Sequence, residues 1–286
     1  MHPAAVALVV AAAVAHAAWN MCAKQVPDGG ALFVWLSAVC STLFQLPLAI
    51  VGIALAGWSV PAFWWLAAVV SGLIHTAYFV ILQRGYRVGD LSVVYPLARG
   101  TGPMLSIVAA IWLFHERPGP VALAGAVAVV VGVWVIGGLG RSGGGSWAGG
   151  VGYGVLCGTT IAAYTLWDAH AVTTAAVSPM VLMGGAAVVQ SAALTPHALH
   201  QRARIAELWR VSKWPVLAVA VLSPLAYLLV LFALRLAPVS LVAPARELSI
   251  VVGSLGAWLV LREPNPGRRI AGAVIVLAGV AAIAAA

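Results

Sequence analysis

The sequence predicts an all-α integral membrane protein whose ten transmembrane helices form two inverted five-helix repeats. First, 63% of its 286 residues are hydrophobic and only 8% are charged, whereas soluble domains carry roughly 25% charged residues. Second, the chain contains ten apolar segments that approach the length of about 20 residues needed to cross a bilayer. Third, features of the first half recur in the second half at a nearly constant spacing. This composition excludes a water-soluble globular domain.

All ten segments are expected to be helices, because backbone groups in lipid must be hydrogen-bonded within their own segment. The N-terminal segment would permit signal-peptide cleavage after Ala17, but it lacks a basic n-region and its apolar run continues to Ala23. We therefore interpret it as a retained first helix. The predicted spans are residues 3–24, 30–56, 61–85, 91–114, 119–138, 148–170, 177–195, 214–236, 240–261 and 267–286.

Two connections between the predicted spans are longer than the others. Residues 139–147 are rich in glycine and serine, and we expect a flexible linker there. It separates a first repeat, residues 1–138, from a second repeat, residues 148–286. Residues 196–215 carry several arginines and histidines, and we expect a solvated, partly helical loop at the membrane surface.

The internal repeat is carried by matched charged residues. Arg99 and Arg246 lie 147 residues apart, each shortly after a proline, and the same spacing relates Glu116 to Glu263. Each repeat holds five spans, an odd number, so two tandem copies must lie in opposite orientations across the membrane. Inverted repeats of this kind usually enclose a substrate site that opens alternately to the two sides. Gene duplication in a structural membrane subunit is the alternative.

A polar stripe on the fourth span is the strongest indication of a binding site. Its members recur at spacings of three and four residues along one helical face: Ser92, Tyr95, Arg99, Gly102 and Ser106. A charge at this depth costs at least about 2.5–3.5 kcal/mol, so it usually faces a partner or an aqueous cavity. We expect a cavity in which Arg99 and Tyr95 contact the substrate. The alternative is an arginine paired inside the bundle without any ligand.

The ninth span carries Arg246 and Glu247 at the depth that matches Arg99. As the repeat counterpart of Arg99, Arg246 is also expected to contact the substrate. Adjacent residues cannot stack on one another as an i,i+4 pair does, so each is expected to find a partner on another helix. Two roles for Glu247 stay open: a carrier of the coupling proton, or the permanent partner of Arg99 in a structural ion pair.

Histidine and aromatic side chains in other spans are further candidates. His75 lies one turn from Tyr78 on the same face, and Trp19 and Tyr164 occupy corresponding places in the first helices of the two repeats. We expect these four residues to bind substrate. His16 is expected to take part in proton coupling, because histidine titrates near neutral pH. For both histidines, a hydrogen bond between helices without a role in transport is the alternative.

Other residues are assigned structural positions. Asp168 and His170 end the sixth predicted span and are expected at the water boundary, which leaves Glu247 as the only acidic residue deep in a helix. Trp64, Trp65 and Trp214 lie near the starts of predicted spans and are expected in interfacial aromatic belts. Small-xxx-small spacing on the sixth span predicts close packing against another helix through Gly150, Gly154 and Gly158.

Several classes of function are disfavoured. The net charge of +8 is spread over the loops, whereas nucleic-acid binding needs a clustered basic surface. The linker contains G-x-G-x-x-G and G-x-S-x-G strings, but neither follows a strand and opens a helix, as a dinucleotide site or a nucleophile elbow requires. The three cysteines show no metal-ligand spacing. We therefore expect no enzymatic activity, no catalytic residue, no metal and no cofactor.

Four stretches carry a resemblance to a known family. They are residues 16–20 (HAAWN), the V-x-P sequence of residues 94–96 and, in each repeat, an acidic turn followed by a glycine-rich helix. The turns contain Glu116 and Glu263. By these features the chain resembles, over nearly its whole length, the EamA-like transporters of the drug/metabolite transporter superfamily. The resemblance implies secondary transport of a small metabolite, often export, through a cavity lined by both repeats.

The predicted function is secondary active transport of a small polar or anionic metabolite by alternating access, with export as the expected direction. A broad-specificity drug exporter and a non-transporting membrane subunit are the alternatives. Cationic drugs would favour aromatic and acidic walls, and the predicted cavity is rich in arginine. Expected partners are the small-molecule substrate and the lipid bilayer, without nucleic acid, and the protein is expected as a monomer or homodimer. The alanine, valine and glycine bias suggests a multi-pass protein of the bacterial inner membrane.

Loop charges and the resemblance disagree on orientation. Loops after odd-numbered spans carry eleven of the 15 lysine and arginine residues, and loops after even-numbered spans carry two. The positive-inside rule therefore places both termini outside the cytoplasm. The family that the chain resembles generally keeps both termini inside, so the orientation stays open.

Overall fold

The structure, a computed structural model, describes residues 1–23, 25–26, 30–89, 91–137, 147–253 and 266–286, and within these ranges all regular secondary structure is helical. The all-α prediction is confirmed. The helices are α1 (Pro3–Ala23), α2 (Gly30–Leu55), α3 (Ala62–Val88), α4 (Leu91–Leu113), α5 (Pro120–Gly137), α6 (Trp147–Thr173), α7 (Pro179–His200), α8 (Arg202–Leu234), α9 (Val239–Ala245) and α11 (Pro266–Ala285). The predicted linker, apart from Trp147, lies outside the described residues.

Apolar side chains cover the outer surface of the helices. Leu43, Ile50 and Val127 are 68%, 55% and 63% exposed, which suits contact with lipid and not with water. Among the described residues, six helices are long and apolar enough to cross a membrane: α1, α2, α3, α7, α8 and α11. The protein is therefore an integral membrane protein, as its composition predicts.

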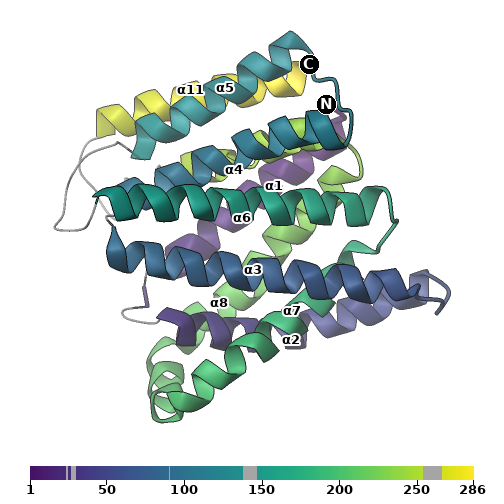
Figure 1. Cartoon of the computed structure of the whole chain (residues 1–286), viewed down its shortest axis with the longest axis vertical. Coiled ribbons are helices and arrows are strands. Elements are labelled where there is room, and N and C mark those ends of the chain that lie inside the picture. The colour runs from purple at the N-terminus through teal and green to yellow at the C-terminus, as the bar shows by residue number, and fades with distance from the viewer. Residues whose placement is uncertain (24, 27–29, 90, 138–146, 254–265) are drawn as a thin grey trace.

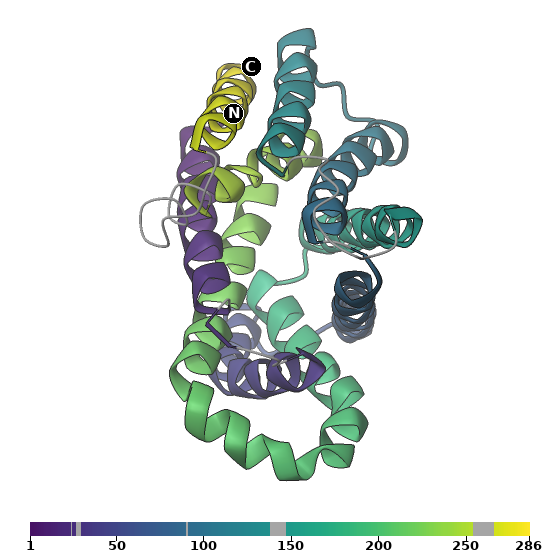
Figure 2. The same cartoon turned by 90° about the vertical axis from the view of Figure 1, so that its left-hand side faces the viewer.

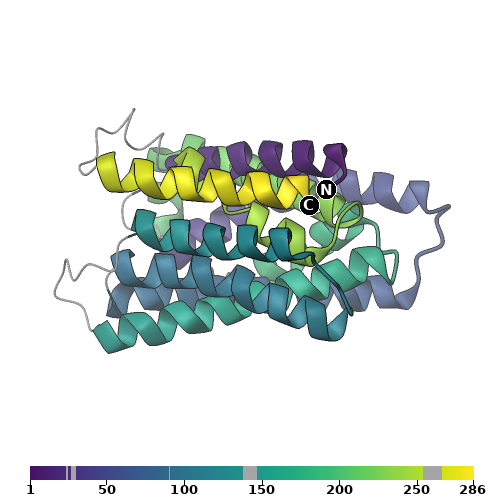
Figure 3. The same ribbon diagram turned by 90° about the horizontal axis from the view of Figure 1, so that it is seen from above.

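The helices form two walls that meet at both ends (Figures 1 and 2). In one wall α1 packs against α8, and in the other α6 packs against both α3 and α4. The pair α5–α11 closes one end, and the pair α2–α7 closes the opposite end. Seen from above, α4, α5, α6 and α11 run along roughly a common direction (Figure 3). The arrangement leaves the inner faces of the two walls turned toward each other.

Helices α1, α2, α3 and α5 of the first repeat correspond to α6, α7, α8 and α11 of the second. The same helix pairs are in contact when each helix is replaced by its counterpart. α1 contacts α8, and its counterpart α6 contacts α3, the counterpart of α8. The pairs α2–α7 and α5–α11 each join two counterparts. Both walls are therefore built from helices of both repeats, and the two-repeat architecture predicted from the sequence is confirmed.

Glycines on α5 and α11 show the relative direction of the repeats. A Cβ atom on Gly125 would lie 2.6 Å from the carbonyl oxygen of Gly279, and one on Gly279 would lie 2.5 Å from that of Gly125. Gly132 and Gly272 face each other in the same way, at 2.9 and 2.8 Å. The later residue of α5 meets the earlier residue of α11, so the helices are antiparallel. Because Gly125 and Gly132 correspond to Gly272 and Gly279, the contact is isologous, as a two-fold axis between inverted repeats requires.

The glycines of α6 permit the close packing that their spacing predicts. A Cβ atom on Gly154 would lie 2.7 Å from Cβ of Leu97, and one on Gly158 would lie 2.7 Å from Cβ of Thr101. Both contacts are with α4. The absence of side chains lets the two backbones approach, which increases the van der Waals contact that joins helices in a membrane.

The segment predicted as a partly helical loop, residues 196–215, is almost entirely helical. α7 continues to His200 and α8 begins at Arg202. The non-helical residue inside α8 is Ser212, with φ −124° and ψ 18°, three residues before Pro215. Proline has no N–H to donate and its ring clashes with the preceding turn, so the helix bends there. The polar sequence signalled solvent exposure correctly, but exposure and helical structure are compatible.

The ninth predicted span, residues 240–261, is not one continuous helix. α9 ends at Ala245, residues 246–247 form a turn, and helical structure resumes at residue 248. Pro244 has no N–H to donate to the preceding turn. The Glu247 N–H bonds instead to the Pro244 carbonyl at 3.0 Å, and the Ser249 N–H bonds to the Arg246 carbonyl at 3.1 Å. This three-residue spacing is that of a tighter 3₁₀ turn, so the two charged residues lie at a break in the helix.

The two chain termini lie side by side. The N-terminal ammonium of Met1 donates a hydrogen bond to the carbonyl oxygen of Ala284 at 2.9 Å. Both termini therefore lie at the same end of the helices, as the ten spans predicted from the sequence require.

The carboxylate of Glu116, in the turn between α4 and α5, binds the start of α9. Its Oε1 accepts a hydrogen bond from the Val239 N–H at 2.8 Å, and its Oε2 accepts one from the Ser240 N–H at 2.9 Å. We expect Glu116→Ala to lower the free energy of unfolding by about 1–2 kcal/mol, because two N–H groups and the helix dipole lose their partner. Hydrogen exchange at the start of α9, followed by mass spectrometry, should become faster. Arg117→Ala, an exposed neighbour, is the control, and unchanged exchange in Glu116→Ala would contradict the role.

Candidate functional site

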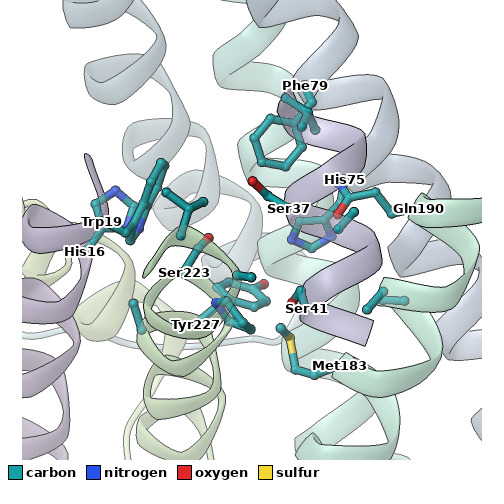
Figure 4. Close-up of a pocket in the computed structure, with 18 of the residues that line it drawn as sticks. His16, Trp19, Ser37, Ser41, His75, Phe79, Met183, Gln190, Ser223 and Tyr227 are labelled. Atoms are coloured by element: carbon teal, nitrogen blue, oxygen red, sulfur yellow. The ribbon is translucent and has the colours of Figure 1, made fainter. Parts of the chain in front are cut away.

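A cavity of about 180 Å³ lies between the two walls (Figure 4). Helices α1 to α4 line it from the first repeat, and α6, α7, α8 and Arg246 line it from the second. Within the described part of the chain, its lining includes two arginines and no aspartate or glutamate. The polar and aromatic lining residues are His16, Trp19, Phe33, Ser37, Ser41, Gln45, His75, Tyr78, Phe79, Arg99, Tyr164, Gln190, Ser223, Tyr227 and Arg246.

The structure brings most of the predicted site residues together at this cavity. Glu247 is buried behind the wall, and Tyr95 does not line the cavity. The predicted residues that line it are His16, Trp19, His75, Tyr78, Arg99, Tyr164 and Arg246. They come from spans as far apart in sequence as the first and the ninth, which the repeat packing brings together.

Arg99 is held by an ion pair at the cavity wall. Its Nε lies 2.9 Å from Oε2 of Glu247, and its Nη2 donates a hydrogen bond to Oγ of Ser249 at 2.8 Å. Arg99 is 6% exposed and Glu247 is 3% exposed. The two charged atoms are close but not aligned as a hydrogen bond, so charge attraction holds them. In a low-dielectric interior each charge removes much of the cost of burying the other, and this geometry favours a structural role for Glu247.

Arg246 has neutral partners. Its Nη1 donates to Oγ1 of Thr165 at 3.3 Å, and its guanidinium lies 5.3 Å from the centre of the Tyr227 ring. A hydroxyl and an aromatic face orient a guanidinium but do not neutralise it. Arg246 therefore presents a less compensated positive charge to the cavity than Arg99 does.

Aromatic rings from α3, α6 and α8 form one side of the cavity. His75 stacks on Tyr164 with ring centroids 4.2 Å apart. Tyr227 meets both rings edge-on, at 5.2 Å from His75 and 5.7 Å from Tyr164, and Tyr78 meets Tyr164 at 5.8 Å. Such pairs favour fixed relative orientations, so this wall is preorganised for a flat or apolar part of a ligand.

The α1 side of the cavity carries the other predicted residues. His16 and Trp19 meet edge-on with ring centroids 4.9 Å apart. Asn20 does not line the cavity; its amide donates to the backbone carbonyl of His16 at 2.7 Å. The indole Nε1 of Trp19 is buried without a hydrogen-bond partner among the described residues. A buried donor of this kind is costly unless a ligand or water accepts its hydrogen.

A polar stripe on α2 escaped the sequence analysis. Ser37, Ser41 and Gln45 are buried and line the cavity, and Gln190 of α7 and Ser223 of α8 join them (Figure 4). The stripe has a sequence signal, because polar residues at a spacing of four in an apolar span share one helical face. Ser37 Oγ, Gln45 Oε1 and Gln190 Nε2 have no hydrogen-bond partner in the described part of the chain, which leaves them available to a ligand.

Only part of the predicted polar stripe on α4 faces the cavity. Tyr95 packs against apolar residues beside α5, and Ser106 is fully buried and bonds the Gly102 carbonyl at 2.9 Å. A Cβ atom on Gly102 would lie 2.7 Å from Cγ2 of Ile161. The prediction is wrong for these three residues, because α4 packs against α5, α6 and α9 and leaves only Arg99 to line the cavity. The side chain of Ser92 lies outside the described residues.

Asp168 and Trp64 are not where the sequence placed them. Asp168 is 0% exposed, and its Oδ2 accepts a hydrogen bond from the Tyr227 hydroxyl at 2.7 Å. α6 continues to Thr173, more than a turn past Asp168, and this moves the residue from the expected helix end into the interior. Glu247 is therefore not the only deeply buried acid. Trp64 is 9% exposed and packs in an apolar core cluster, so it is not an interfacial residue.

Comparisons with known proteins were made for the whole chain. A family model described as the EamA-like transporter family matches residues 3–138 and 148–285. A solved structure entitled "Crystal structure of protein" is similar over 99% of this chain and 96% of that chain, with a TM-score of 0.79 and 15% sequence identity. At that identity the likeness shows a shared fold. No curated protein matches.

Proposed function

The chain belongs to the EamA-like transporter family, and on that premise we propose that it is a secondary transporter of a small polar or anionic metabolite. The observation that carries the proposal is the cavity between the two walls, with arginines but no acidic residue in its described lining. An intramembrane cation is costly and marks a substrate pathway by default. Arg246, whose direct partners are the neutral Thr165 and Tyr227, is the residue we propose as the main anion contact.

The other lining groups support a ligand with both polar and apolar parts. Trp19 Nε1 and Gln190 Nε2 are buried donors without partners among the described residues, and such donors suit the oxygen atoms of an anion. The stacked wall of His75 and Tyr164 suits an apolar or planar portion. We propose that Trp19, His75, Tyr78, Tyr164 and Arg246 contact the substrate directly. Arg99 would act from the cavity edge while it stays paired with Glu247.

Alternating access is the mechanism that the architecture favours. The cavity lies where helices of the two inverted repeats meet, the usual place for a site that opens to each side in turn. The helix break at residues 246–247 places Arg246 on an interrupted helix, and interrupted helices are another common feature of transporter sites. Export is the direction implied by the family resemblance, and the bacterial inner membrane is the location we propose from composition.

A broad-specificity exporter of cationic drugs is the second candidate. The ring cluster of His75, Tyr78, Tyr164 and Tyr227 favours it, since aromatic faces attract organic cations. The two arginines weigh against it, because like charges repel in a low-dielectric cavity.

Thermal stability of the purified protein against a ligand panel tests the proposal. The panel comprises amino acids, organic acids, phosphonates and cationic drugs. A ligand that binds only the folded state stabilises it by about 2.7 kcal/mol at a hundredfold excess over its dissociation constant. We expect an anion to stabilise the wild type and to lose that effect in Arg246→Ala.

The control for this experiment is Arg210→Ala, which removes an exposed arginine of α8 that does not line the cavity. It should leave ligand stabilisation unchanged. Stabilisation by cationic drugs that persists in Arg246→Ala would replace the anion proposal with the drug exporter. Absence of stabilisation by every compound would count against a small-molecule site.

A further inference from the structure

Asp168 is a buried carboxyl group without a directly bonded cation. It is 0% exposed on α6, and its Oδ2 accepts the Tyr227 hydroxyl at 2.7 Å. Its Oδ1 is buried and has no hydrogen bond of acceptable geometry among the described residues. An ionised carboxylate placed in an apolar interior is costly unless it is paired and fully hydrogen-bonded. One oxygen of Asp168 is thus left with the capacity to hold a proton.

The polar and charged groups that act on Asp168 come from α3, α8 and the helix break after α9. α3 contributes His75 and the hydroxyl of Ser71, α8 contributes Tyr227, and the break after α9 contributes Arg246. Arg246 attracts the carboxylate, but its nearest recorded contacts are Thr165 and the Tyr227 ring. Glu247 differs in kind, because Arg99 lies against it at 2.9 Å.

A path of polar groups joins Asp168 to the cavity. Tyr227 and His75 both line the cavity, and their rings meet with centroids 5.2 Å apart. Nδ1 of His75 lies 2.9 Å from the backbone carbonyl of Ser71. A carbonyl can only accept, so Nδ1 carries the hydrogen and Nε2 of the neutral ring is an acceptor. The imidazole can therefore take a proton on Nε2 while its orientation stays fixed by the other nitrogen.

We propose that Asp168 is the proton-binding residue of this protein, with Tyr227 as its positioning residue and His75 as the neighbouring acceptor at the cavity. The proton adds to Oδ1, the carboxyl oxygen without a hydrogen-bond partner among the described residues, and Oδ2 becomes the carbonyl oxygen bonded by Tyr227. No bond other than O–H forms or breaks. The Arg99–Glu247 pair then keeps a structural role.

Charge balance links this proton to the cavity, and this step rests on the proposed transport of an anion. When Asp168 is ionised, it offsets the charge of Arg246 across the Tyr227 ring. When Asp168 is protonated, Arg246 stands uncompensated in the wall and attracts an anion more strongly. Binding of a proton and of an anion therefore favour each other, and such a coupling is reciprocal.

Infrared difference spectroscopy between acidic and neutral pH tests the proton site without any substrate. With the full-length protein in lipid vesicles, we expect a carboxylic-acid C=O band that appears on acidification and is absent in Asp168→Asn. Glu247→Gln is the matched control and should keep the band. A band that persists in Asp168→Asn, or one that disappears only in Glu247→Gln, would overturn the proposal.

Tyr227→Phe provides a second readout in case Asp168→Asn does not fold. It removes the hydrogen bond to Oδ2, so the C=O band should move to higher wavenumber while remaining titratable. An unmoved band would show that the titrating carboxyl is not Asp168. The infrared spectra need no ligand, so failure of the anion proposal would leave the assignment of the proton site to Asp168 intact. If the infrared experiment instead excludes Asp168, the stability panel still tests anion binding at Arg246.

Discussion

Arg99→Met is expected to lower the free energy of unfolding by about 3–5 kcal/mol, because it leaves the Glu247 carboxylate buried without its charged partner. Glu247 is 3% exposed and its Oε2 lies 2.9 Å from Nε of Arg99. The loss of the hydrogen bond from Arg99 to Ser249 adds to the effect. Unfolding in detergent micelles, followed by circular dichroism against increasing denaturant, measures the change.

The double variant Arg99→Met/Glu247→Leu tests whether the loss of stability comes from leaving the Glu247 carboxylate buried without a charged partner. Replacing both members of a buried ion pair with apolar residues is often neutral or even stabilising, so most of the stability should return. A double variant as unstable as Arg99→Met would show that the pair does more than compensate charge. Unchanged stability in Arg99→Met would contradict the structural role that we assign to the pair.

Gly279→Ala is expected to lower the free energy of unfolding by about 1–3 kcal/mol through overpacking. The added Cβ would lie 2.5 Å from the carbonyl oxygen of Gly125 and 2.8 Å from Cγ2 of Val129. A backbone carbonyl cannot rotate away, so α5 and α11 must separate. The pseudo-two-fold relation predicts a comparable loss for Gly132→Ala, whose Cβ would meet the carbonyl of Gly272.

The matched control is Gly152→Ala on α6, where a Cβ atom would have no neighbour within 4 Å. Alanine in a helix interior is favoured over glycine by about 0.5–1 kcal/mol, so this variant should be neutral or slightly stabilised. Thermal unfolding of the three variants in the same detergent compares them. Equal stability of Gly279→Ala and Gly152→Ala would refute the backbone contact between α5 and α11.

The sequence predicts the fold well because its signals are long and repeated. The apolar spans and the 147-residue offset between Arg99 and Arg246 extend over the whole chain. An error in the predicted boundary of one span therefore does not change the predicted repeat. The cavity residues Trp19 and Tyr164 follow from the same repeat. His75 and Arg246 follow from the cost of burying polar groups in lipid.

Details of the site depend on neighbours that a single sequence does not reveal. Tyr95 shares a helical face with Arg99, yet α4 is surrounded by other helices and the tyrosine packs against them. Asp168 was assigned to a helix end, and only the length of α6 and the partner Tyr227 show it to be interior. The stripe of Ser37 and Gln45 carries a periodic signal, but serine and glutamine are also common packing residues in membrane helices.

The ion pair of Arg99 has no possible counterpart in the other repeat. Arg246 corresponds to Arg99, but the residue that corresponds to Glu247 is Gly100, which has no side chain to offer. Under the alternating access that we propose, the two repeats would exchange their conformations, and the residue at position 100 could not form the equivalent pair with Arg246. Each difference of about 1.4 kcal/mol between two arrangements changes their ratio tenfold. We therefore expect the arrangement that contains the Arg99–Glu247 pair to be the more stable of the two.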